Sequence, residues 1–325
     1  MTLNLKSGLS DDMVSMLEFR HSMGFSVENY VARCKSLDRF CNEYFPNEKE
    51  LNENIVLGWL QSRPNEVMIL NQRASFIRVL SKYIRSTGKN AYVLPDKFIP
   101  PQKPYVPYIL SDKELARLFC VIDEAPENYR LDILQPSLFS TLFRLIYTCG
   151  LRPNEGRTLL CKNIDLRSGE ILITGTKAHK ERIVVMSDDM CALARRYDVL
   201  RNATHPNSEC FFPSKNGTPY TEKMLGWHFK NFVAAAYSYL EKESLPPVRI
   251  YDLRHRFATT IILKWIDEGK NLYSMLPYLS TYMGHAKISH TAYYIHLIPE
   301  NIRASRGIDW KTMGSVIPEV QLWGK

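Results

Sequence analysis

The stretch GHAKISHTAYYIH, residues 284–296, sets the chemistry that the rest of the chain can serve. It holds three histidines and two tyrosines within thirteen residues. We expect Ser289 to cap a short helix on which Tyr294 lies one turn beyond His290, with His285 in the preceding turn. A tyrosine presented beside imidazoles indicates a phenolic nucleophile with proton carriers close by. The alternative for this stretch taken alone is an aromatic helix packed into a core, with hydroxyls that are merely hydrogen-bonded.

Three further polar segments precede this stretch: TCGLRPNE at 148–155, GTKAHKER at 175–182 and YDLRHRFAT at 251–259. In this order the four segments resemble the active-site boxes of the tyrosine recombinases, the family of phage integrases and Xer-type recombinases. The resemblance covers roughly residues 105–300, and the residues before them match the family only in general character. It implies site-specific cutting and rejoining of DNA through a 3′-phosphotyrosine intermediate, with no metal or nucleotide cofactor.

Such chemistry makes three demands on side chains. A tyrosine phenol has a pKa of about 10 and is a poor nucleophile until a proton acceptor or a positive field assists it. The charge that develops on the phosphate oxygens needs fixed cations, and planar, bidentate arginines supply them well. The leaving 5′ oxygen needs a proton donor, which a lysine in a turn can provide.

The resemblance assigns these roles to particular residues of this chain. Tyr294 would be the nucleophile, Arg152 and Arg254 the two phosphate clamps, and Lys177 the proton donor. His285 would be a further phosphate ligand or proton carrier.

Three supporting residues follow from the same resemblance. Glu155 stands where the family carries an acidic residue that supports the first arginine. His255 follows the second arginine directly, and His296 follows the tyrosine by two positions.

Two positions depart from the family pattern or leave it ambiguous. The family usually carries histidine three residues before the second arginine, and here that residue is Tyr251. We include Tyr251 among the catalytic residues because its hydroxyl can donate to a phosphate oxygen, although it is a much weaker base at neutral pH. Proton removal from Tyr294 would then rely on His285, on water or on the field of the arginines. Tyr294 matches the family spacing from His285 and Tyr293 is one residue short, and adjacent residues on a helix point about 100° apart.

Composition supports a polyanionic partner. Basic residues exceed acidic ones by 42 − 34 = 8, and 45% of the residues are hydrophobic, enough for real cores. The seven cysteines form no CxxC pair, which indicates reduced thiols in a cytosol-like compartment and argues against a zinc finger. No signal-peptide core is apparent, and no apolar run approaches the roughly 20 residues of a membrane span.

Residues 1–94 are predicted to form a helical bundle, which the resemblance identifies with the core-DNA-binding, SAM-like domain of the family. Within it, Arg78, Lys82 and Arg85 share one face of a helix that ends near Gly88, and Lys89 follows. We expect these four cations to contact DNA phosphates, and an ordinary solvated face is the alternative.

The remainder divides into a linker, a second domain and a tail. Five prolines between 95 and 107 predict a stiff extended linker without a helix. Residues 108–301 are predicted to form the catalytic domain of mixed α+β type, mainly α with a small antiparallel sheet from a hairpin of 171–174 and 183–186. Residues 302–325 are too apolar for a free tail, and the resemblance implies that they dock on a neighbouring subunit, with docking on the chain's own catalytic domain as the alternative.

Besides Ser289, two further helix caps are predicted in the second domain. Ser111 and Glu114 have the spacing of a capping box, and Thr221 precedes a further helix.

The resemblance also implies partners: double-stranded DNA with specific half-sites, a dimer on one site, a homotetramer on two, and an accessory DNA-bending or directionality protein. It implies a nucleoid-associated, cytoplasmic protein of prokaryotic, phage or mobile-element origin. The alternatives are a cut-and-reseal enzyme of the type IB topoisomerase kind, a DNA-binding regulator without cleavage, and a metalloenzyme built on His285, His290 and His296. The third lacks acidic partners and an HExxH pattern, and we expect no metal site.

Overall fold

The computed structural model describes residues 3–62, 67–98, 105–124, 129, 132–174 and 181–298. The chain divides into two compact units, residues 1–104 and 105–325. The division falls within the proline-rich stretch 95–107.

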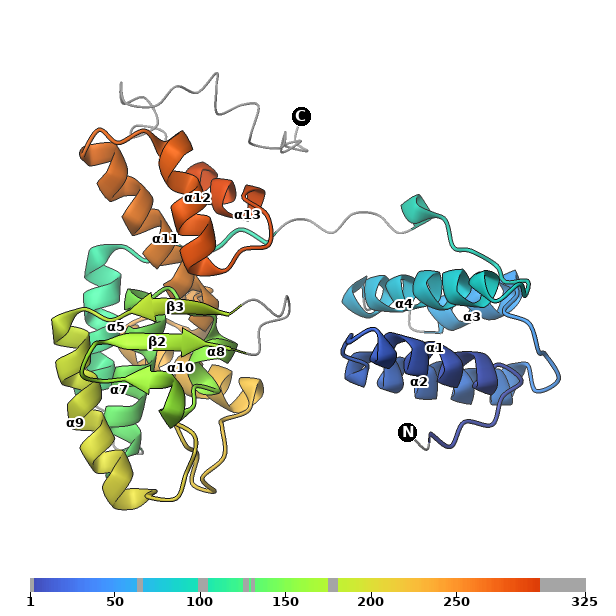
Figure 1. Cartoon of the computed structure of the whole chain (residues 1–325), viewed down its shortest axis with the longest axis horizontal. Coiled ribbons are helices and arrows are strands. Elements are labelled where there is room, and N and C mark those ends of the chain that lie inside the picture. The colour runs from blue at the N-terminus through green and yellow to red at the C-terminus, as the bar shows by residue number, and fades with distance from the viewer. Residues whose placement is uncertain are drawn as a thin grey trace. The chain divides into compact units, whose positions relative to one another are not determined.

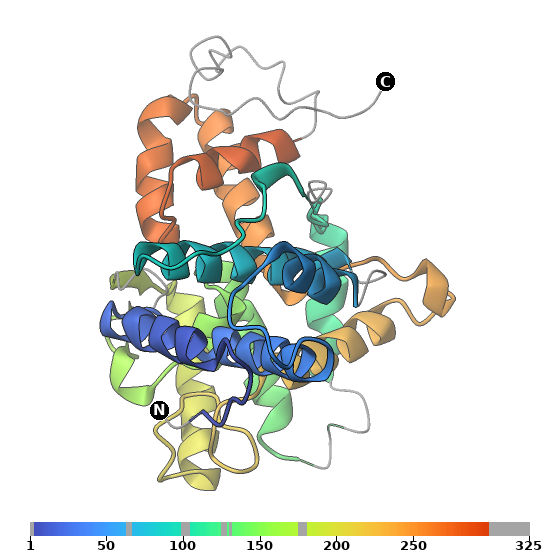
Figure 2. The same ribbon diagram turned by 90° about the vertical axis from the view of Figure 1, so that its right-hand side faces the viewer.

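The first unit is a bundle of helices (Figures 1 and 2). Its elements are α1 (Ser10–Ser22), α2 (Glu28–Tyr44), α3 (Glu53–Gln61), α4 (Val67–Ser86) and the 3-10 turn η1 (Asp96–Phe98). On α2 the buried residues Cys34, Leu37 and Cys41 recur at three- and four-residue steps, so one face of the helix enters the core. Trp59 of α3 and Phe76 of α4 meet edge to face with ring centroids 5.8 Å apart. The bundle therefore closes around an aromatic centre.

The turn η1 corrects the expectation that no helix forms in the proline-rich stretch. Residues 96–98 lie between the prolines, and Phe98 N–H donates to the Pro95 carbonyl. A single 3-10 turn needs no amide from proline, so proline at its start is tolerated where a longer helix is not.

The second unit packs helices against one face of a small sheet (Figure 1). Its helices are α5 (Asp112–Glu124), α7 (Gln135–Thr148), α8 (Pro153–Arg157), α9 (Asp188–Thr204), α10 (Glu222–Ala236), α11 (Ile250–Asp267), α12 (Leu272–Met283) and α13 (Ser289–Ala292). Its 3-10 turns are η2 (Cys161–Asn163), η3 (Lys242–Ser244) and η4 (Tyr293–Leu297), and its strands are β1 (Ile164–Asp165), β2 (Glu170–Ile173) and β3 (Arg182–Val185).

The sheet is antiparallel in the order β1-β2-β3. The predicted hairpin is confirmed as β2 and β3, in which Ile171 pairs with Val184 and Ile173 with Arg182. The short β1 adds a third strand that the sequence did not indicate, since two residues carry no period. One face of the sheet is buried through Ile171, Ile173 and Val184. Buried and exposed side chains therefore alternate along the strands, and the buried ones pack the sheet against the helices.

Two of the three predicted helix caps are confirmed. Ser111 and Glu114 form the expected capping box, with Ser111 N–H donating to the Glu114 carboxylate at 2.8 Å. The Thr221 hydroxyl accepts from Met224 N–H at 3.2 Å. The predicted Ser289 cap is wrong, because Ile288 is the N-cap and makes no side-chain cap bond.

The helix after Ser289 is also shorter than expected. The α-helical turn α13 ends at Ala292, and the chain continues directly as the 3-10 turn η4 with Tyr293 and Tyr294 at its start. A 3-10 turn tightens the chain to three residues per turn.

Helix α7 is the centre of the second unit. Its residues Leu138, Phe139, Leu142, Phe143 and Ile146 are all fully buried. They pack toward α5, α9 and α11, and α11 in turn contacts η4, so α7 supports the helix on which the end of the stretch 284–296 packs. A second apolar cluster joins α11, α12 and η4, and β3 is the sheet edge that α12 contacts (Figure 1).

Among the described helices, none combines the length and the hydropathy of a membrane-spanning segment.

Gly150 follows α7 in the left-handed region, with φ of +61°. A Cβ there would lie 2.4 Å from the Phe257 ring. Gly217 has a similar φ of +75°, but a Cβ there would meet nothing within 4 Å.

Gly217→Ala should lower the free energy of unfolding by about 1–2 kcal/mol through backbone strain alone. Gly150→Ala should lower it by about 1–3 kcal/mol more, because the added methyl overpacks the core.

Urea denaturation of the full chain measures both variants. Equal losses of stability would show that the close approach of Phe257 to Gly150 does not constrain the fold.

Candidate active site

The carboxylate of Glu155 gathers the cations of the site. It accepts from the Arg152 backbone N–H at 2.8 Å, from Arg152 Nη1 at 2.7 Å, and from both terminal nitrogens of Arg182 at 2.9 and 2.7 Å. Burial alone would raise the pKa of Glu155, but the hydrogen bonds and charge of Arg182, with the donors of Arg152, lower it to about 2. Glu155 is therefore a fixed anion, in keeping with the supporting position predicted for it.

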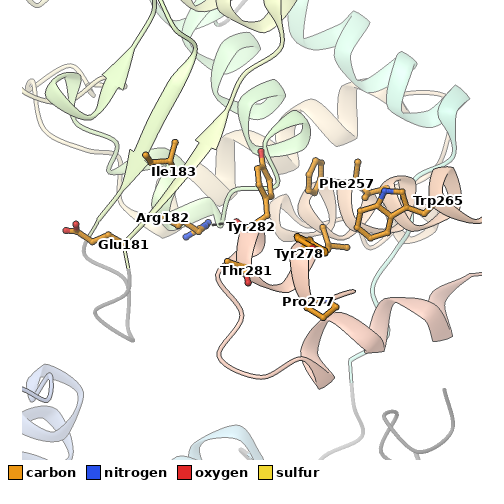
Figure 3. A pocket seen from close by; sticks show the side chains of 11 residues that line it. Glu181, Arg182, Ile183, Phe257, Trp265, Pro277, Tyr278, Thr281 and Tyr282 are labelled. Carbon is orange, nitrogen blue, oxygen red and sulfur yellow. Dashed lines mark hydrogen bonds between the residues drawn. The ribbon is translucent and has the colours of Figure 1, made fainter. Parts of the chain in front are cut away.

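Arg182 is a residue of this network to which the sequence analysis gave no role. It is the first residue of β3 and is nearly buried, with 8% of its side chain exposed. Its Nε–H donates to the Tyr282 carbonyl at 2.8 Å, a contact visible in Figure 3. Arg182 thereby ties the sheet edge both to Glu155 and to the end of α12. The only signal in the sequence is its place as the last residue of the segment 175–182.

The turn after α12 is shaped by the same arginine. Gly284 adopts φ of +65°, and a Cβ at this position would lie 3.0 Å from Arg182 Nη1. Glycine supplies both the left-handed backbone that ends the helix and the room for the guanidinium. His285 follows directly, so its position depends on this contact.

Arg152 is the N-cap residue of α8 and its side chain is 30% exposed. Besides its bonds to Glu155, its Nη2 donates to the Gly284 carbonyl at 2.6 Å. The side chain is therefore oriented from two sides while part of its guanidinium remains open to solvent. This is the geometry that a phosphate clamp needs.

Arg254 lies in α11 and is fully buried. Its Nη1 donates to the Gly150 carbonyl at 2.6 Å and its Nη2 to the Met283 carbonyl at 2.6 Å. Burial lowers the pKa of Arg254, yet a guanidinium remains charged in proteins. Its Nε–H is buried and has no acceptor. Arg254 thus lies beside Gly150 and Met283, where it braces the backbone and solvent does not reach it.

His285 is held by both of its ring nitrogens. Nε2 lies 3.0 Å from Arg254 Nη2, and Nδ1 lies 2.7 Å from the Thr291 hydroxyl. Burial and the charges of Arg254 and Arg152 lower its pKa to about 3, so the ring is neutral at physiological pH. His285 therefore lies in the site as predicted, with its orientation fixed.

Tyr294 is buried in η4, with 2% of its surface exposed. Its hydroxyl lies 3.2 Å from His255 Nδ1, and its ring stacks near His285 with centroids 6.1 Å apart. Burial raises the pKa of Tyr294 to about 12, although the positive charge of Arg254 acts in the opposite direction. The structure thus brings Tyr294, His285, His255 and Arg254 together, as the sequence predicted.

The two other tyrosines lie on the rim of this cluster. Tyr293 is half-buried, and its hydroxyl donates to the Tyr105 carbonyl at 3.4 Å, away from the histidines. Tyr251 is 36% exposed, and its ring centroid lies 5.0 Å from that of His255. Its ring thus lies beside His255, and the Tyr294 hydroxyl contacts His255 directly.

Other predicted site residues are placed less centrally or fall outside the description. His296 is half-buried on η4, and His290 is exposed with its ring 6.1 Å from that of His285. Lys177 lies outside the described residues, as do residues 302–325 of the tail. Within the described part of the chain, no group of three or more histidine, cysteine, aspartate or glutamate side chains could hold a metal ion.

The four cations predicted to contact DNA differ in their partners within the first unit. Arg78 donates to the Leu94 carbonyl at 3.3 Å and to the Pro95 carbonyl at 2.6 Å. Lys89 pairs with Asp12 at 2.6 Å. Lys82 and Arg85 are exposed, and Lys89 is exposed as well despite its ion pair, so three of the four predicted DNA-binding cations face solvent and Arg78 is engaged with backbone carbonyls.

A hollow of about 1000 Å³ adjoins the network on the side of Arg182. It lies between β3, α11 and α12 and is lined mainly by apolar side chains, among them Ile183, Phe257, Trp265 and Tyr278 (Figure 3). Arg182 stands in its wall with its guanidinium turned to Tyr282 and Glu155, so the hollow is a feature beside the site and not the site itself.

Comparison with known proteins finds relatives over most of the chain. It is 28% identical over 294 residues to a putative integrase/recombinase, y4rB, of Sinorhizobium fredii, covering 87% of this chain and 91% of that protein. It is 24% identical over 306 residues to the tyrosine recombinase XerC of Natranaerobius thermophilus, covering 89% of this chain and 95% of the relative.

A solved structure shares the fold. It is the XerH site-specific recombinase bound to a palindromic difH substrate in a post-cleavage complex, with a TM-score of 0.67, 18% identity, and coverage of 95% of this chain and 98% of the XerH chain. The profile of the phage integrase family matches residues 109–301, more than half of the sequence. The chain therefore belongs to the phage integrase family, the tyrosine recombinases.

Proposed function

We propose that the protein cuts and rejoins DNA strands at specific sites, with Tyr294 as the nucleophile. One observation carries the proposal: the Tyr294 hydroxyl is buried in contact with a neutral imidazole and close to the charge of Arg254. A merely structural tyrosine would need no such cations around it. The positive charge beside the Tyr294 hydroxyl would stabilise an anionic phosphate. Membership of the phage integrase family supports the same function.

The reaction begins when a DNA phosphodiester enters beside Arg152, the partly exposed clamp. Tyr294 attacks the phosphorus, a 3′-phosphotyrosine bond forms, and the bond to the 5′ oxygen breaks. Lys177 supplies a proton to the leaving oxygen, and Arg152, Arg254 and His285 stabilise the charge on the phosphate. Attack by a second 5′ hydroxyl on the phosphotyrosine reverses these steps and rejoins the strand.

Binding of DNA must also expose the side chains that react with the phosphate. Arg254 and Tyr294 are buried in the free protein, and neither can touch a phosphate in that state. The orphaned Nε–H of Arg254 is a donor that a phosphate oxygen would satisfy. We therefore expect the groups around η4 to move when DNA binds.

The partners follow from the same proposal. Double-stranded DNA with specific half-sites is the substrate, a dimer occupies one site, and a homotetramer joins two. Lys82 and Arg85 in the first unit contribute contacts to the DNA backbone. Docking of residues 302–325 on a neighbouring subunit, and a DNA-bending or directionality protein, stay predictions. We further propose that the reaction takes place at the nucleoid of a prokaryotic cell, on host, phage or mobile-element DNA.

The comparisons do not favour the alternative functions. The relatives and the solved neighbour described above are named as recombinases or integrases, which speaks against a type IB topoisomerase-like enzyme. A DNA-binding regulator that has lost cleavage would not need the contact between Tyr294 and His255.

Tyr294→Phe should abolish covalent linkage to DNA and leave DNA affinity nearly unchanged, because only the nucleophilic oxygen is lost. The assay is adduct formation on a nicked suicide duplex that carries the native site, sought in the DNA flanking the gene. Tyr293→Phe is the matched control and should form the adduct, since the Tyr293 hydroxyl turns to Tyr105. The reverse pattern would assign the nucleophile to Tyr293.

Arg152→Lys should slow cleavage on the order of a hundredfold or more, because one ammonium cannot reproduce the two-pronged contact of a guanidinium. Arg144→Lys is the control, since Arg144 also forms a forked pair with a carboxylate, Asp123, and has no proposed role. Single-turnover cleavage rates compare them. Equal rates for Arg152→Lys and wild type would remove Arg152 from the phosphate.

Lys177→Ala should slow cleavage of ordinary DNA but not of DNA with a bridging sulfur at the 5′ position. A thiolate leaves without a proton, so the donor becomes unnecessary. Cleavage rates on the two substrates give the test, and equal defects on both would make Lys177 a binding residue only.

A further inference from the structure

We propose that His255 is the proton acceptor for Tyr294, a catalytic role that rests on the proposed function of the site. In the pattern of the family a histidine stands at the position of Tyr251, and this chain lacks it there. His255 lies one turn further along α11, and its Nδ1 is 3.2 Å from the Tyr294 hydroxyl. The other described side chain that bonds to that hydroxyl is Arg254, and a guanidinium can only donate and cannot take a proton.

His285 cannot take the proton, because both of its nitrogens are engaged. Arg254 has only donors, so His285 Nε2 must be the acceptor of their 3.0 Å contact. Nδ1 then carries the hydrogen and donates it to the Thr291 hydroxyl at 2.7 Å. No lone pair of the ring remains for Tyr294.

His255 is in the opposite situation. Arg254 donates to the Tyr294 hydroxyl, which leaves the phenol hydrogen to point at His255 Nδ1. We assign the hydrogen of the neutral His255 ring to Nε2, so that Nδ1 offers a lone pair to Tyr294. Burial, with the positive charges of Arg249 and Arg254, lowers its pKa to about 4. The charged and titratable groups facing it are Arg249, Arg254 and Tyr251 from its own helix and Tyr294 from η4.

In the free protein the proton stays on the phenol, because His255 is the weaker base. A bound phosphodiester brings a negative charge into the site and raises the pKa of the imidazole. The phenol loses its basicity as its oxygen bonds to phosphorus, so transfer is favourable during the attack.

The step balances in atoms and charge. The Tyr294 oxygen bonds to phosphorus while its proton passes to His255 Nδ1, which makes an imidazolium. The bond from phosphorus to the 5′ oxygen breaks, and that oxygen takes a proton from Lys177. Rejoining runs the same transfers backward, with the imidazolium returning its proton to the phenolate.

The test is the rate of adduct formation by His255→Gln as a function of pH, on the nicked duplex that carries the native site. A glutamine oxygen can accept the hydrogen bond from Tyr294 but cannot take its proton. We expect a rate at pH 7 that is on the order of 10²–10⁴-fold lower. The rate should then rise about tenfold per pH unit from pH 7 to 9, because only the phenolate fraction reacts. The wild-type rate should be level over that range.

Two controls separate this role from a structural one. His205→Gln makes the same substitution at the end of α9, where the imidazole contacts only Thr204 among the hydrogen bonds of the described residues, and should keep the wild-type rate and profile. His255→Ala leaves a space at the phenol, and added imidazole should restore part of its rate. Duplex affinity and the thermal unfolding midpoint of each variant report whether the fold is intact.

The outcomes distinguish this inference from the function on which it rests. A His255→Gln variant with the wild-type rate and a level profile, in an enzyme whose adduct depends on Tyr294, would overturn the role of His255 alone. A low but level rate without rescue of His255→Ala by imidazole would make His255 structural. An adduct that survives Tyr294→Phe would overturn the proposed function itself.

Discussion

The carboxylate of Glu155 is the interaction on which the rest of the site depends. A buried carboxylate is costly to desolvate and persists as an anion only when cations and donors surround it. Here Arg152 and Arg182 bond to it directly, and Arg254 Nη1 lies 4.0 Å away. These three arginines come from α8, the start of β3 and α11, so one anion fixes the relative positions of three elements. Three buried or half-buried guanidinium groups would repel one another without it.

The arginines in turn hold the backbone around the nucleophile. Arg182 reaches the Tyr282 carbonyl, Arg254 the Met283 carbonyl and Arg152 the Gly284 carbonyl. Three successive carbonyls at the end of α12 are thus each bound by a different arginine. Such carbonyls have no partner within a helix, and the site uses this to place His285. The electrostatic centre and the helix end are therefore one structure.

Much of this arrangement could be predicted from the sequence. The four segments brought together the residues that the structure places in the site, because side-chain type and order carry that information. The partners of each residue could not be predicted. Arg182 resembled any cation before a strand, and the contact of His255 with Tyr294 depends on how η4 crosses α11. Arg78 and Lys89 resembled free surface cations because their acceptors, Leu94 and Asp12, come from other elements. Long-range contacts of this kind leave no local period in a sequence.

The burial of Arg254 bears on how activity would be lost in evolution. Its guanidinium links α11 to Gly150, which is 104 residues away in sequence, and to Met283 at the end of α12. A descendant that only bound DNA would still need this link in order to fold, so selection for stability would retain the arginine after cleavage had disappeared. The Tyr294 hydroxyl has no comparable structural role, because in the described structure it bonds to the side chains of His255 and Arg254 and to no distant backbone carbonyl. Among homologous chains, an arginine at the position of Arg254 is therefore a marker of the fold. A tyrosine at the position of Tyr294 together with a histidine at that of His255 is the better marker of an active enzyme.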